Sequence, residues 1–457
     1  MTSSNKRPYA EKDTPRTLAV QILGRVEEGA FAQPLLDAFL SRGTLPAAQD
    51  KGLLTQLVYG TLRLRGRLDW ILEAVYTGNI KDMDPRIRNI LRVALYQLMY
   101  ADRVPAYAAT NEAVEMTKRW FPGRSNLVNA ILRNAVRRMD TIPYPSPDDD
   151  PLSHISVVHS HPLWLVRLWA DQLGIEETRA LCESDNEVPP LTVRANRLKT
   201  TRSDLVARLE ESGCKAAPTP YAPDGIGLSD LPVSVGEMPP YKEGQMQIQD
   251  EASQLISLLL DPQPGEKVLD LCAGVGIKTT HLAHLMRNRG RIIAIDISRK
   301  KIESSQILAR RLGATIIEPI VHDATQAPPE DLRGRFDRIL VDVPCSGLGT
   351  LRRNPEIRWN TAPEVLSTSP PLQREILNRS VSYLKRGGTV VYSTCTISSA
   401  ENEAVIGEFL ADNPGFAPVF PATVPAGMLD GKGMFRTFPH RHGTDGFFAA
   451  ILKKKGV

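Results

Sequence analysis

The stretch KVLDLCAGVGIKTTHLAHLMRNRGRIIAIDI, residues 267–297, contains the pattern that decides the fold. Here an apolar run leads through a glycine-containing turn into a helix-like segment, and a second apolar run comes after it. Five such runs lie at 267–272, 291–297, 314–321, 338–343 and 389–395. Runs rich in Val and Ile with little polar alternation are typical of strands buried on both faces of a parallel sheet. The pattern predicts a doubly wound, Rossmann-like α/β domain over residues 244–457, with its ligand site outside the carboxyl ends of the strands.

Upstream of this domain, the sequence predicts a helical bundle and then a small α+β module. Apolar residues fall on one helical face in 87–100 and in 126–138, where we expect Leu127, Val128, Ile131, Leu132 and Val136 to face inward. The prolines of 141–151 predict the end of the bundle. A strand-like run at 191–196 and a helix-like segment at 200–212 suggest the second module. The predicted domains are therefore 1–141, 142–243 and 244–457.

Composition narrows the class of protein. The chain has 457 residues, of which 42% are hydrophobic and 24% charged, as in folded globular proteins. No apolar run of eighteen residues occurs and the first residues have no apolar stretch, so we expect a cytoplasmic protein that has no contact with a membrane. Five cysteines without a CxxC pair argue against a disulfide framework or a zinc ribbon.

Basic residues are concentrated at the N-terminal end. Residues 1–141 hold 21 Lys and Arg against 14 Asp and Glu, while the remainder holds 35 against 38. A positive helical part joined to a near-neutral one predicts an appendage that binds a polyanion. A solvated, arginine-rich surface would give the same counts, and charge alone leaves both interpretations open.

The turn after the first apolar run suits a nucleoside-containing cofactor. Gly274 and Gly276 would let a cofactor approach the backbone, and Asp296 comes twenty residues later, where an acid can accept hydrogen bonds from ribose hydroxyls. Thr279 stands where a dinucleotide-binding fingerprint requires a third glycine, and no Gly-Lys-Thr phosphate loop is present. S-adenosylmethionine, which has a ribose but no phosphate, satisfies these conditions. Asp323 could then contact the adenine amino group, or it could cap a helix.

Two cysteines come after the fourth and fifth apolar runs. Cys345 and Cys395 would both lie at carboxyl ends of strands, beside the cofactor. A single cysteine is most often a small buried hydrophobic residue, but two facing one cleft by chance is much less common. Amino-group methyltransferases place an aromatic residue after a Pro-Pro pair here, whereas this chain has Cys345 after Pro344, so methylation of an amino nitrogen is disfavoured.

A thiol beside a methyl donor has a use on pyrimidines. Carbon 5 of cytosine is a poor nucleophile until a thiolate adds to carbon 6 and makes carbon 5 enamine-like. A carboxyl group must also stabilise charge at ring nitrogen 3, and Asp342 stands three residues before Cys345. The product must then lose a proton and the enzyme sulfur, which gives a second group a role.

At these residues the chain resembles the RNA 5-methylcytosine methyltransferases of the NOL1/NOP2/Sun family. The segments that carry the resemblance are VLDLCAGVGIKTTHLA, AIDIS, VHDA, DVPCSGLGTLRRNPEIRW, YSTCT with Glu401, Asn402 and Glu403, and HGTDGFF. The N-terminal segments ALYQLMYADRVPAYAATNEAV and SNLVNAILRNAVRR resemble the NusB-type helical RNA-binding domain found in the bacterial RsmB branch. The resemblance implies an all-α NusB-like bundle, a small α+β RNA-binding module and a Rossmann-like catalytic domain.

The resemblance also implies roles for individual residues. Cys395 would be the nucleophile and Cys345 the thiol that assists product release, while Asp342 would contact the base and Lys278 would reach toward it. Asp250 would be a helix cap or a cofactor-side contact. The residues implied to hold S-adenosylmethionine are Cys272, Ala273, Gly274, Val275, Gly276, Ile277, Lys278, Asp296, Asp323 and Asp342. The residues implied to flank RNA are Arg352, Arg353, Arg358 and Trp359.

One position departs from the family pattern. Ile277 replaces a glycine of the usual Ala-Pro-Gly-Gly-Lys turn, which is costly if the backbone there has positive φ. His281 and His284 lie three apart on a predicted helix, but no pattern of further ligands accompanies them, so we expect no metal site.

The function expected from the resemblance is methylation of carbon 5 of a cytosine in RNA, with small-subunit (16S) ribosomal RNA as the partner and the protein acting as a monomer. The N-terminal helical fusion favours ribosomal RNA. Two alternatives stay open, namely the same chemistry on transfer RNA and a catalytically silent RNA-binding protein of ribosome assembly. The intact cysteines speak against a silent protein.

Overall fold

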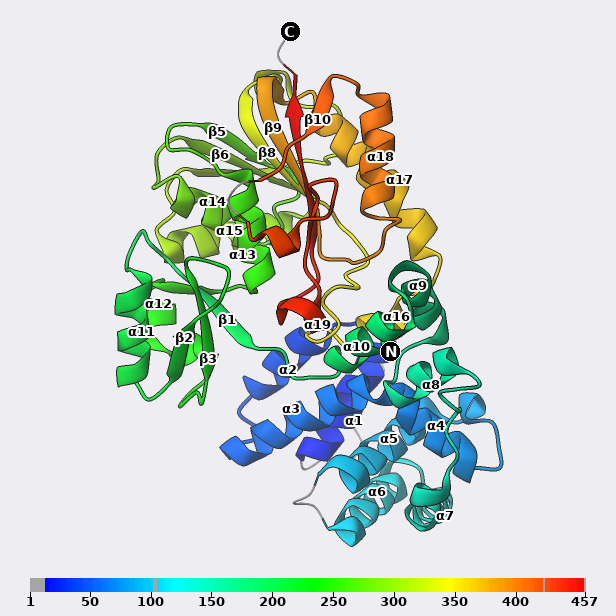
Figure 1. Cartoon of the computed structure of the whole chain (residues 1–457). Coiled ribbons are helices and arrows are strands. Elements are labelled where there is room, and N and C mark those ends of the chain that lie inside the picture. Colours follow the sequence, from blue (N-terminus) through cyan, green and yellow to red (C-terminus); the bar gives the residue numbers. More distant parts are fainter. Residues whose placement is uncertain (1–12, 102–104, 422–423, 456–457) are drawn as a thin grey trace, which may run out of the picture. The chain divides into compact units, whose positions relative to one another are not determined.

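The computed structural model describes residues 13–101, 105–421 and 424–455 (Figure 1). The first twelve residues, which begin the predicted 1–141 domain and in which we expect no apolar targeting stretch, lie outside the described residues. Contacts divide the chain into two compact units. The helical unit runs up to Glu187 and also includes Arg353–Thr361, and the sheet unit comprises Val188–Arg352 and Ala362–Val457.

Within the described residues, the helical unit is built of helices and their connections. Two of its helices start at side-chain caps: the Thr14 and Thr17 side chains form a capping box around Pro15, and Asp84 caps the helix that begins at Pro85. No described helix is long and apolar enough to cross a membrane. The α-helices are α1 (Pro15–Glu27), α2 (Ala32–Leu40), α3 (Ala48–Arg63), α4 (Arg65–Val75), α5 (Pro85–Tyr100), α6 (Ala106–Trp120), α7 (Ser125–Arg138), α8 (Pro151–Val158), α9 (Leu163–Leu173), α10 (Ile175–Ser184) and α16 (Ile357–Asn360).

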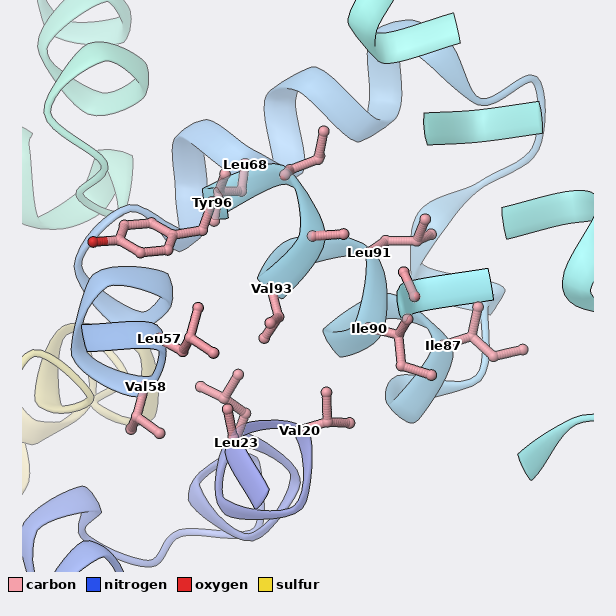
Figure 2. Packing of buried hydrophobic residues seen from close by; sticks show 14 of the residues in the cluster. Val20, Leu23, Leu57, Val58, Leu68, Ile87, Ile90, Leu91, Val93 and Tyr96 are labelled. Carbon is pink, nitrogen blue, oxygen red and sulfur yellow. The ribbon is translucent and has the colours of Figure 1, made fainter. Parts of the chain in front are cut away.

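A single apolar core holds the first seven of these helices together. Side chains of α1, α3, α4 and α5 converge there, among them Leu23, Leu57 and Ile90, as Figure 2 shows. Helices α3 and α5 approach closely at Gly60, where an added Cβ would lie 2.1 Å from the ring of Tyr96. The inward face predicted for α7 is correct except at Val136, which is 48% exposed because Ala135 occupies the buried position instead.

The proline-rich segment separates α7 from α8, and the helices after it belong to the same helical unit. Its backbone is tied to α4, since the Trp70 indole N–H donates to the Pro143 carbonyl at 3.1 Å. Helices α8 to α10 come next, and this part of the unit ends at Glu187. The boundary between compact units therefore lies downstream of the 141/142 boundary predicted from the prolines.

The sheet unit begins with a small antiparallel sheet in the order β2-β3-β1-β4. Helix α11 packs on this sheet through Leu205 and Leu209, which are buried against Val193 and Ile226. This is the α+β module predicted from the sequence. Its elements are β1 (Leu191–Ala195), α11 (Arg202–Glu211), β2 (Lys215–Pro218), β3 (Gly225–Ser229), α12 (Pro239–Lys242) and β4 (Met246–Ile248).

The second sheet has the order β10-β12-β9-β8-β5-β6-β7, with β11 paired to β12. Strands β5 to β9 are parallel, and β12 runs antiparallel to β9. The five parallel strands correspond to the five predicted runs, and the strand order reverses between β5 and β8. The elements are α13 (Glu251–Leu260), β5 (Lys267–Asp270), α14 (Ile277–Leu285), β6 (Arg291–Asp296), α15 (Arg299–Leu312), β7 (Ile317–Val321), β8 (Phe336–Asp342), α17 (Val365–Ser380), β9 (Leu384–Thr394), α18 (Glu403–Asp412), β10 (Phe416–Pro418), β11 (Phe435–Arg436), α19 (Pro439–His442) and β12 (Phe448–Lys454).

Helices cover both faces of this sheet, which explains the continuous apolar runs (Figure 1). In β8, Ile339 and Val341 face the core shared with α17 and α18, whereas Leu340 faces the core shared with α13, α14 and α15. Both side-chain directions are buried, so every strand position favours an apolar residue. The predicted architecture, a helical bundle, a small α+β module and a Rossmann-like α/β domain, is present in the structure.

Candidate active site

The turn after β5 carries the two glycines expected to admit a cofactor. Both have positive φ, +59° at Gly274 and +86° at Gly276, a region that L side chains rarely adopt. Gly276 also approaches α15, since an added Cβ would lie 2.9 Å from Cβ of Ser305. Ile277 is the first residue of α14 and is not among the positive-φ residues. The β-branched side chain is therefore accommodated without backbone strain at this departure from the family pattern.

Asp296 ends β6 and faces this turn. Its Oδ2 accepts a hydrogen bond from the Gly274 N–H at 3.0 Å, and its Oδ1 accepts one from the Ser298 N–H at 2.8 Å. These bonds fix the carboxylate at the carboxyl edge of β5 and β6, at the place where the sequence predicts a ribose-binding acid.

Asp323 comes after β7 at the same edge of the sheet. Its Oδ1 accepts hydrogen bonds from the backbone N–H and the hydroxyl of Thr325, at 2.9 and 2.8 Å, and these bonds lower its pKa. No helix begins at this position, so the alternative of a helix cap is wrong and Asp323 instead stabilises a turn.

Lys278 and Asp342 form an ion pair at the carboxyl ends of β5 and β8, where the strand order reverses. The Lys278 Nζ lies 2.6 Å from Oδ2 of Asp342, and the Ser393 hydroxyl donates to Oδ1 at 2.7 Å. Burial lowers the pKa of Lys278, but the charge of Asp342 and the hydrogen bond to it outweigh burial and raise that pKa above its ordinary value. The ammonium also lies 5.1 Å from the centre of the Phe447 ring. The predicted approach of Lys278 to Asp342 is present in the structure.

The two cysteines predicted to share a cleft are adjacent. Sγ of Cys345, after β8, lies 3.4 Å from Sγ of Cys395, after β9. The hydrogen bond to Cys395 and burial raise the pKa of the Cys345 thiol well above its usual range, so Cys345 is protonated at neutral pH. Strands β8 and β9 are neighbours in the sheet, and their parallel register brings both loops to one edge.

The remaining residues of the turn have different surroundings. Cys272 packs against the core on the α17 side, and burial raises its pKa, so this thiol has a structural environment. The Ala273 N–H donates to the Ile295 carbonyl at 2.8 Å and joins the turn to β6. Val275 is 43% exposed.

Family models match three successive parts of the chain. Residues 13–137 match the NusB family, and residues 161–235 match the ferredoxin-like domain of RsmF/B-like methyltransferases. Residues 257–453, which hold the cysteine pair and the ion pair, match the model described as 16S rRNA methyltransferase RsmB/F.

Relatives align over nearly the whole chain. A Bacillus subtilis protein named as a probable ribosomal RNA small subunit methyltransferase B is 35% identical over 98% of this chain and 100% of its own length. A Synechocystis protein of the same name is 37% identical over 96% and 99%. The chain belongs to the RsmB/F family of methyltransferases. The RsmB/F fold is also similar to the crystal structure of PH0851, with a TM-score of 0.82, 29% identity and coverage of 97% of this chain and 99% of that one.

In this RsmB/F methyltransferase, three of the residues predicted to flank RNA, namely Arg352, Arg358 and Trp359, form hydrogen bonds within the protein. The Arg352 guanidinium donates to the Gly443 carbonyl at 2.7 Å. Arg353 begins the segment that belongs to the helical unit. There Arg358 is fully buried and donates to Oδ1 of Asn186 at 2.8 Å, while the Trp359 indole N–H donates to the Leu62 carbonyl at 2.7 Å. These contacts give Arg358 and Trp359 a structural role, and contact with RNA stays a prediction.

Sequence reasoning missed several RsmB/F site residues. Glu401 and Asn402 appeared only as part of a signature, yet both are buried and bonded to the loops that carry the two cysteines. Ser393, which bonds Asp342, was overlooked because serine on a strand gives no local signal. Asp250, by contrast, caps α13 through the Ala252 N–H at 2.8 Å, in agreement with one of its two predicted roles.

One cluster of three potential metal ligands occurs among the described residues, namely Asp224, His281 and His284. Nε2 of His284 lies 3.4 Å from Oδ2 of Asp224. Burial and the charge of Arg194 lower the pKa of both histidines, that of His284 to about 3, so both are neutral. Arg197 also donates to Asp224. Two guanidinium charges beside the cluster oppose a further cation, and we assign no metal to it.

Proposed function

We propose that this RsmB/F methyltransferase transfers a methyl group from S-adenosylmethionine to carbon 5 of a cytosine in small-subunit ribosomal RNA. The observation that carries the proposal is the pair of thiols 3.4 Å apart, beside the Asp342 carboxylate on the same edge of the sheet. The names of the relatives, which specify the small ribosomal subunit, support the class of substrate.

The residues at the ends of β5 and β6 suit S-adenosylmethionine. We propose that Asp296 accepts hydrogen bonds from the ribose hydroxyls. A Cβ added at Gly274 would meet nothing within 4 Å, so the backbone there is open to a ligand. Ile297, directly after Asp296, is 69% exposed and offers an apolar surface for the adenine ring. When bound, the donor supplies an electrophilic methyl group on a sulfonium.

Cys395 is the nucleophile in this proposal. As its thiolate adds to carbon 6 of cytosine, an S–C6 bond forms and the electron pair of the C5–C6 double bond becomes available at carbon 5. Carbon 5 then takes the methyl group as the bond from the methyl carbon to the sulfonium sulfur breaks, and the electron pair of that bond stays on the sulfur. Asp342, held by Lys278 and Ser393, contacts the base. The Lys278 ammonium paired with Asp342 offsets the negative charge that develops at ring nitrogen 3 and is the source of the proton that this nitrogen takes up.

Release of the product requires elimination of the carbon 5 proton and of the enzyme sulfur. The C5–H bond breaks and its electron pair restores the C5–C6 double bond, while the C6–S bond breaks and Cys395 leaves as a thiolate. The proton passes to water. Because the Cys345 thiol keeps its proton and lies 3.4 Å from Cys395, its S–H can donate a hydrogen bond to the departing sulfur. We therefore assign assistance of release to Cys345.

The helical unit supplies a surface for RNA. Arg133, Arg137 and Arg138 of α7 are exposed, and Arg-rich surfaces neutralise phosphates. The target cytosine must leave its stack before carbon 6 can meet a thiol. We propose that the helical unit binds the RNA by its phosphates and that the sheet unit carries out the chemistry.

The test is denaturing gel electrophoresis of wild type, Cys345→Ala and Cys395→Ala with unmodified small-subunit ribosomal RNA and S-adenosylmethionine. We expect Cys345→Ala to accumulate a nuclease-sensitive covalent adduct and Cys395→Ala to form none. Incorporation of labelled methyl groups by the wild type is measured in parallel, with transfer RNA as a second substrate.

The outcomes separate the alternatives. Methyl transfer to transfer RNA alone would replace the proposed substrate. An adduct in Cys395→Ala but not in Cys345→Ala would exchange the roles of the two thiols. A wild type that binds RNA without transferring a methyl group to either substrate would favour the silent RNA-binding alternative.

A further inference from the structure

The side chain of Glu401 is a buried carboxylate with no assigned task. It is fully buried just before α18, next to the loops that come after β8 and β9. A buried carboxylate is costly unless hydrogen-bond donors surround it. The donors around Glu401 therefore indicate which part of the site the carboxylate stabilises.

Among the described residues, the donors to this carboxylate belong to, or support, the loop that carries Cys345. Oε1 accepts the Ser346 N–H at 2.9 Å, and Oε2 accepts the Ser346 hydroxyl. Oε1 also accepts Nε2 of Gln373 at 3.0 Å, and the same amide nitrogen donates to the Pro344 carbonyl at 3.0 Å. The residues on either side of Cys345 are thus bonded to Glu401, directly or through Gln373.

The neighbouring residue holds the other cysteine loop. Oδ1 of Asn402 accepts the Thr394 hydroxyl at 2.6 Å, and Nδ2 of Asn402 donates to the Thr396 carbonyl at 3.0 Å. Thr394 and Thr396 flank Cys395. Glu401 therefore holds the loop that carries Cys345, and Asn402, next to it in the chain, holds the loop that carries Cys395. The Ser346 hydroxyl lies 2.9 Å from that of Thr396 and joins the loops.

We propose that Glu401 is a positioning residue that holds the release thiol, Cys345, against Cys395, while Asn402 positions the nucleophile. The proposal rests on the proposed function, since it assigns Glu401 to the release step of that reaction. The Tyr392 hydroxyl, which donates to the Glu401 carbonyl at 2.6 Å, fixes the backbone from which the carboxylate extends.

A carboxylate is required at this position because the three groups that bond to it act as donors. If the NH₂ of an amide at position 401 took the place of Oε1, it would face two N–H donors and both hydrogen bonds would be lost. If it took the place of Oε2, it would donate to the Ser346 hydroxyl, and a weaker neutral hydrogen bond would replace the charge-assisted one. The negative charge of Glu401 also contributes to the raised pKa of Cys345, after the larger effects of Cys395 and of burial. Glu401→Gln therefore disturbs the position of the release thiol and lowers its pKa.

The experiment compares Glu401→Gln with Asn402→Ala under single-turnover conditions, with unmodified small-subunit ribosomal RNA and labelled S-adenosylmethionine. For Glu401→Gln we expect the first methyl transfer to stay within about threefold of wild type. Release should slow about tenfold, or about 1.4 kcal/mol, because the charge-assisted hydrogen bonds to the Cys345 loop are lost, so that the covalent adduct accumulates. For Asn402→Ala we expect methyl transfer and adduct formation to fall together.

Two further variants make the test specific. Glu408→Gln removes an exposed carboxylate of α18 that pairs with Arg374 at the surface, and it should behave as wild type. Gln373→Leu removes the bridge to Pro344 without changing residue 401 and should also accumulate adduct. If thermal melting shows that Glu401→Gln is not folded, the test rests on Gln373→Leu alone.

Two results would overturn the proposal. One is release of product by Glu401→Gln at the wild-type rate. The other is loss of methyl transfer and adduct together in a folded Glu401→Gln, which would assign Glu401 to the nucleophile. Failure of the proposed function itself has a different signature, because wild type would then transfer no methyl group and Cys345→Ala would form no adduct.

Discussion

The ammonium of Lys278 lies 2.6 Å from the carboxylate of Asp342. This ion pair joins the first turn of α14 to the last residue of β8, where the strand order of the sheet reverses. Without the ammonium, Asp342 would keep the hydrogen bond from the Ser393 hydroxyl but not its charge partner. We expect Lys278→Met to lower the rate of methyl transfer at least about tenfold, since an uncompensated charge would remain where the base must bind. The measurement is single-turnover methyl incorporation.

Lys453→Met, which changes an exposed lysine of β12, is the matched control. A wild-type rate for folded Lys278→Met would remove the ion pair from the mechanism.

Gly349 fixes the backbone of the nucleophile. Its N–H donates to the Cys395 carbonyl at 3.0 Å, and an added Cβ would lie 1.9 Å from the Gly446 carbonyl oxygen. Gly349→Ala should therefore displace the backbone of Cys395 and lower adduct formation by more than about tenfold. Gly407→Ala, in α18 with nothing within 4 Å of the added Cβ, should raise stability by about 0.5–1 kcal/mol and leave activity unchanged. Equal activity of the two variants would contradict this account.

The buried carboxyl of Asp270 makes stability depend on pH. Burial raises its pKa to about 7, although the Thr279 hydroxyl donates to it at 2.7 Å. The unfolded pKa is about 3.9, so between about pH 4 and 7 the folded chain binds more protons than the unfolded chain. The contribution of Asp270 to stability is therefore full below about pH 4 and declines as pH rises to about 7.

Asp270→Asn should remove this decline. We expect the free energy of unfolding of the variant to gain on that of wild type between about pH 5 and about pH 8, by up to a few kcal/mol, as measured by urea unfolding at both pH values. An identical difference between the two proteins at both pH values would show that the carboxyl does not titrate in this range.

Arg358 should stabilise the helical unit. Its buried guanidinium donates to the Asn186 side chain and to the carbonyls of Asp185 and Ser160, at 2.8, 3.0 and 3.2 Å. Arg358→Met should cost about 2–4 kcal/mol, because buried acceptors would be left without charged donors. Urea unfolding measures this, with exposed Arg133→Met as control. Unchanged stability together with weaker RNA binding would instead support the RNA contact predicted from the sequence.

The exposed arginines of α7 should make RNA binding depend on salt. A plot of log affinity against log salt should be steep for wild type. In the triple variant Arg133→Gln, Arg137→Gln, Arg138→Gln, the slope should flatten by about one unit for each phosphate that is no longer neutralised. Filter binding between low and physiological salt provides the slope. A variant with changes at exposed Lys453 and Lys455 should keep the wild-type slope, and a salt-insensitive wild type would contradict phosphate binding.

Local sequence pattern was sufficient to predict the parallel strands and the residues placed directly after them. Runs buried on both faces have a composition that marks them, and parallel strands bring their carboxyl ends, with residues such as Asp296, Asp342 and Cys395, to one edge. Local pattern could not predict whether the turn tolerates Ile277, because the energetic cost of a β-branched residue depends on the backbone angle φ, which only the fold determines.

Relationships across long sequence separations could not be predicted. The bonds of Glu401 to Ser346 and of Asn402 to the Cys395 loop depend on how the chain turns from β9 into α18. Arg358 resembled an RNA-binding residue because arginine beside tryptophan is typical of such surfaces. Its acceptors, Asn186 and Ser160, are 172 and 198 positions away in the chain, and no local pattern indicates them.

The segment Arg353–Thr361 means that the chain passes between its two units three times, after Glu187, after Arg352 and after Thr361. A single cut at 187/188 would therefore not produce two complete proteins. The N-terminal fragment would lack the segment that bonds Asn186, and the C-terminal fragment would carry a fully buried arginine with its partners removed. For a protein engineer, residues 1–187 and 353–361 must therefore be exchanged together: a chimaera that takes its helical part from another relative must take the 353–361 segment from that relative as well.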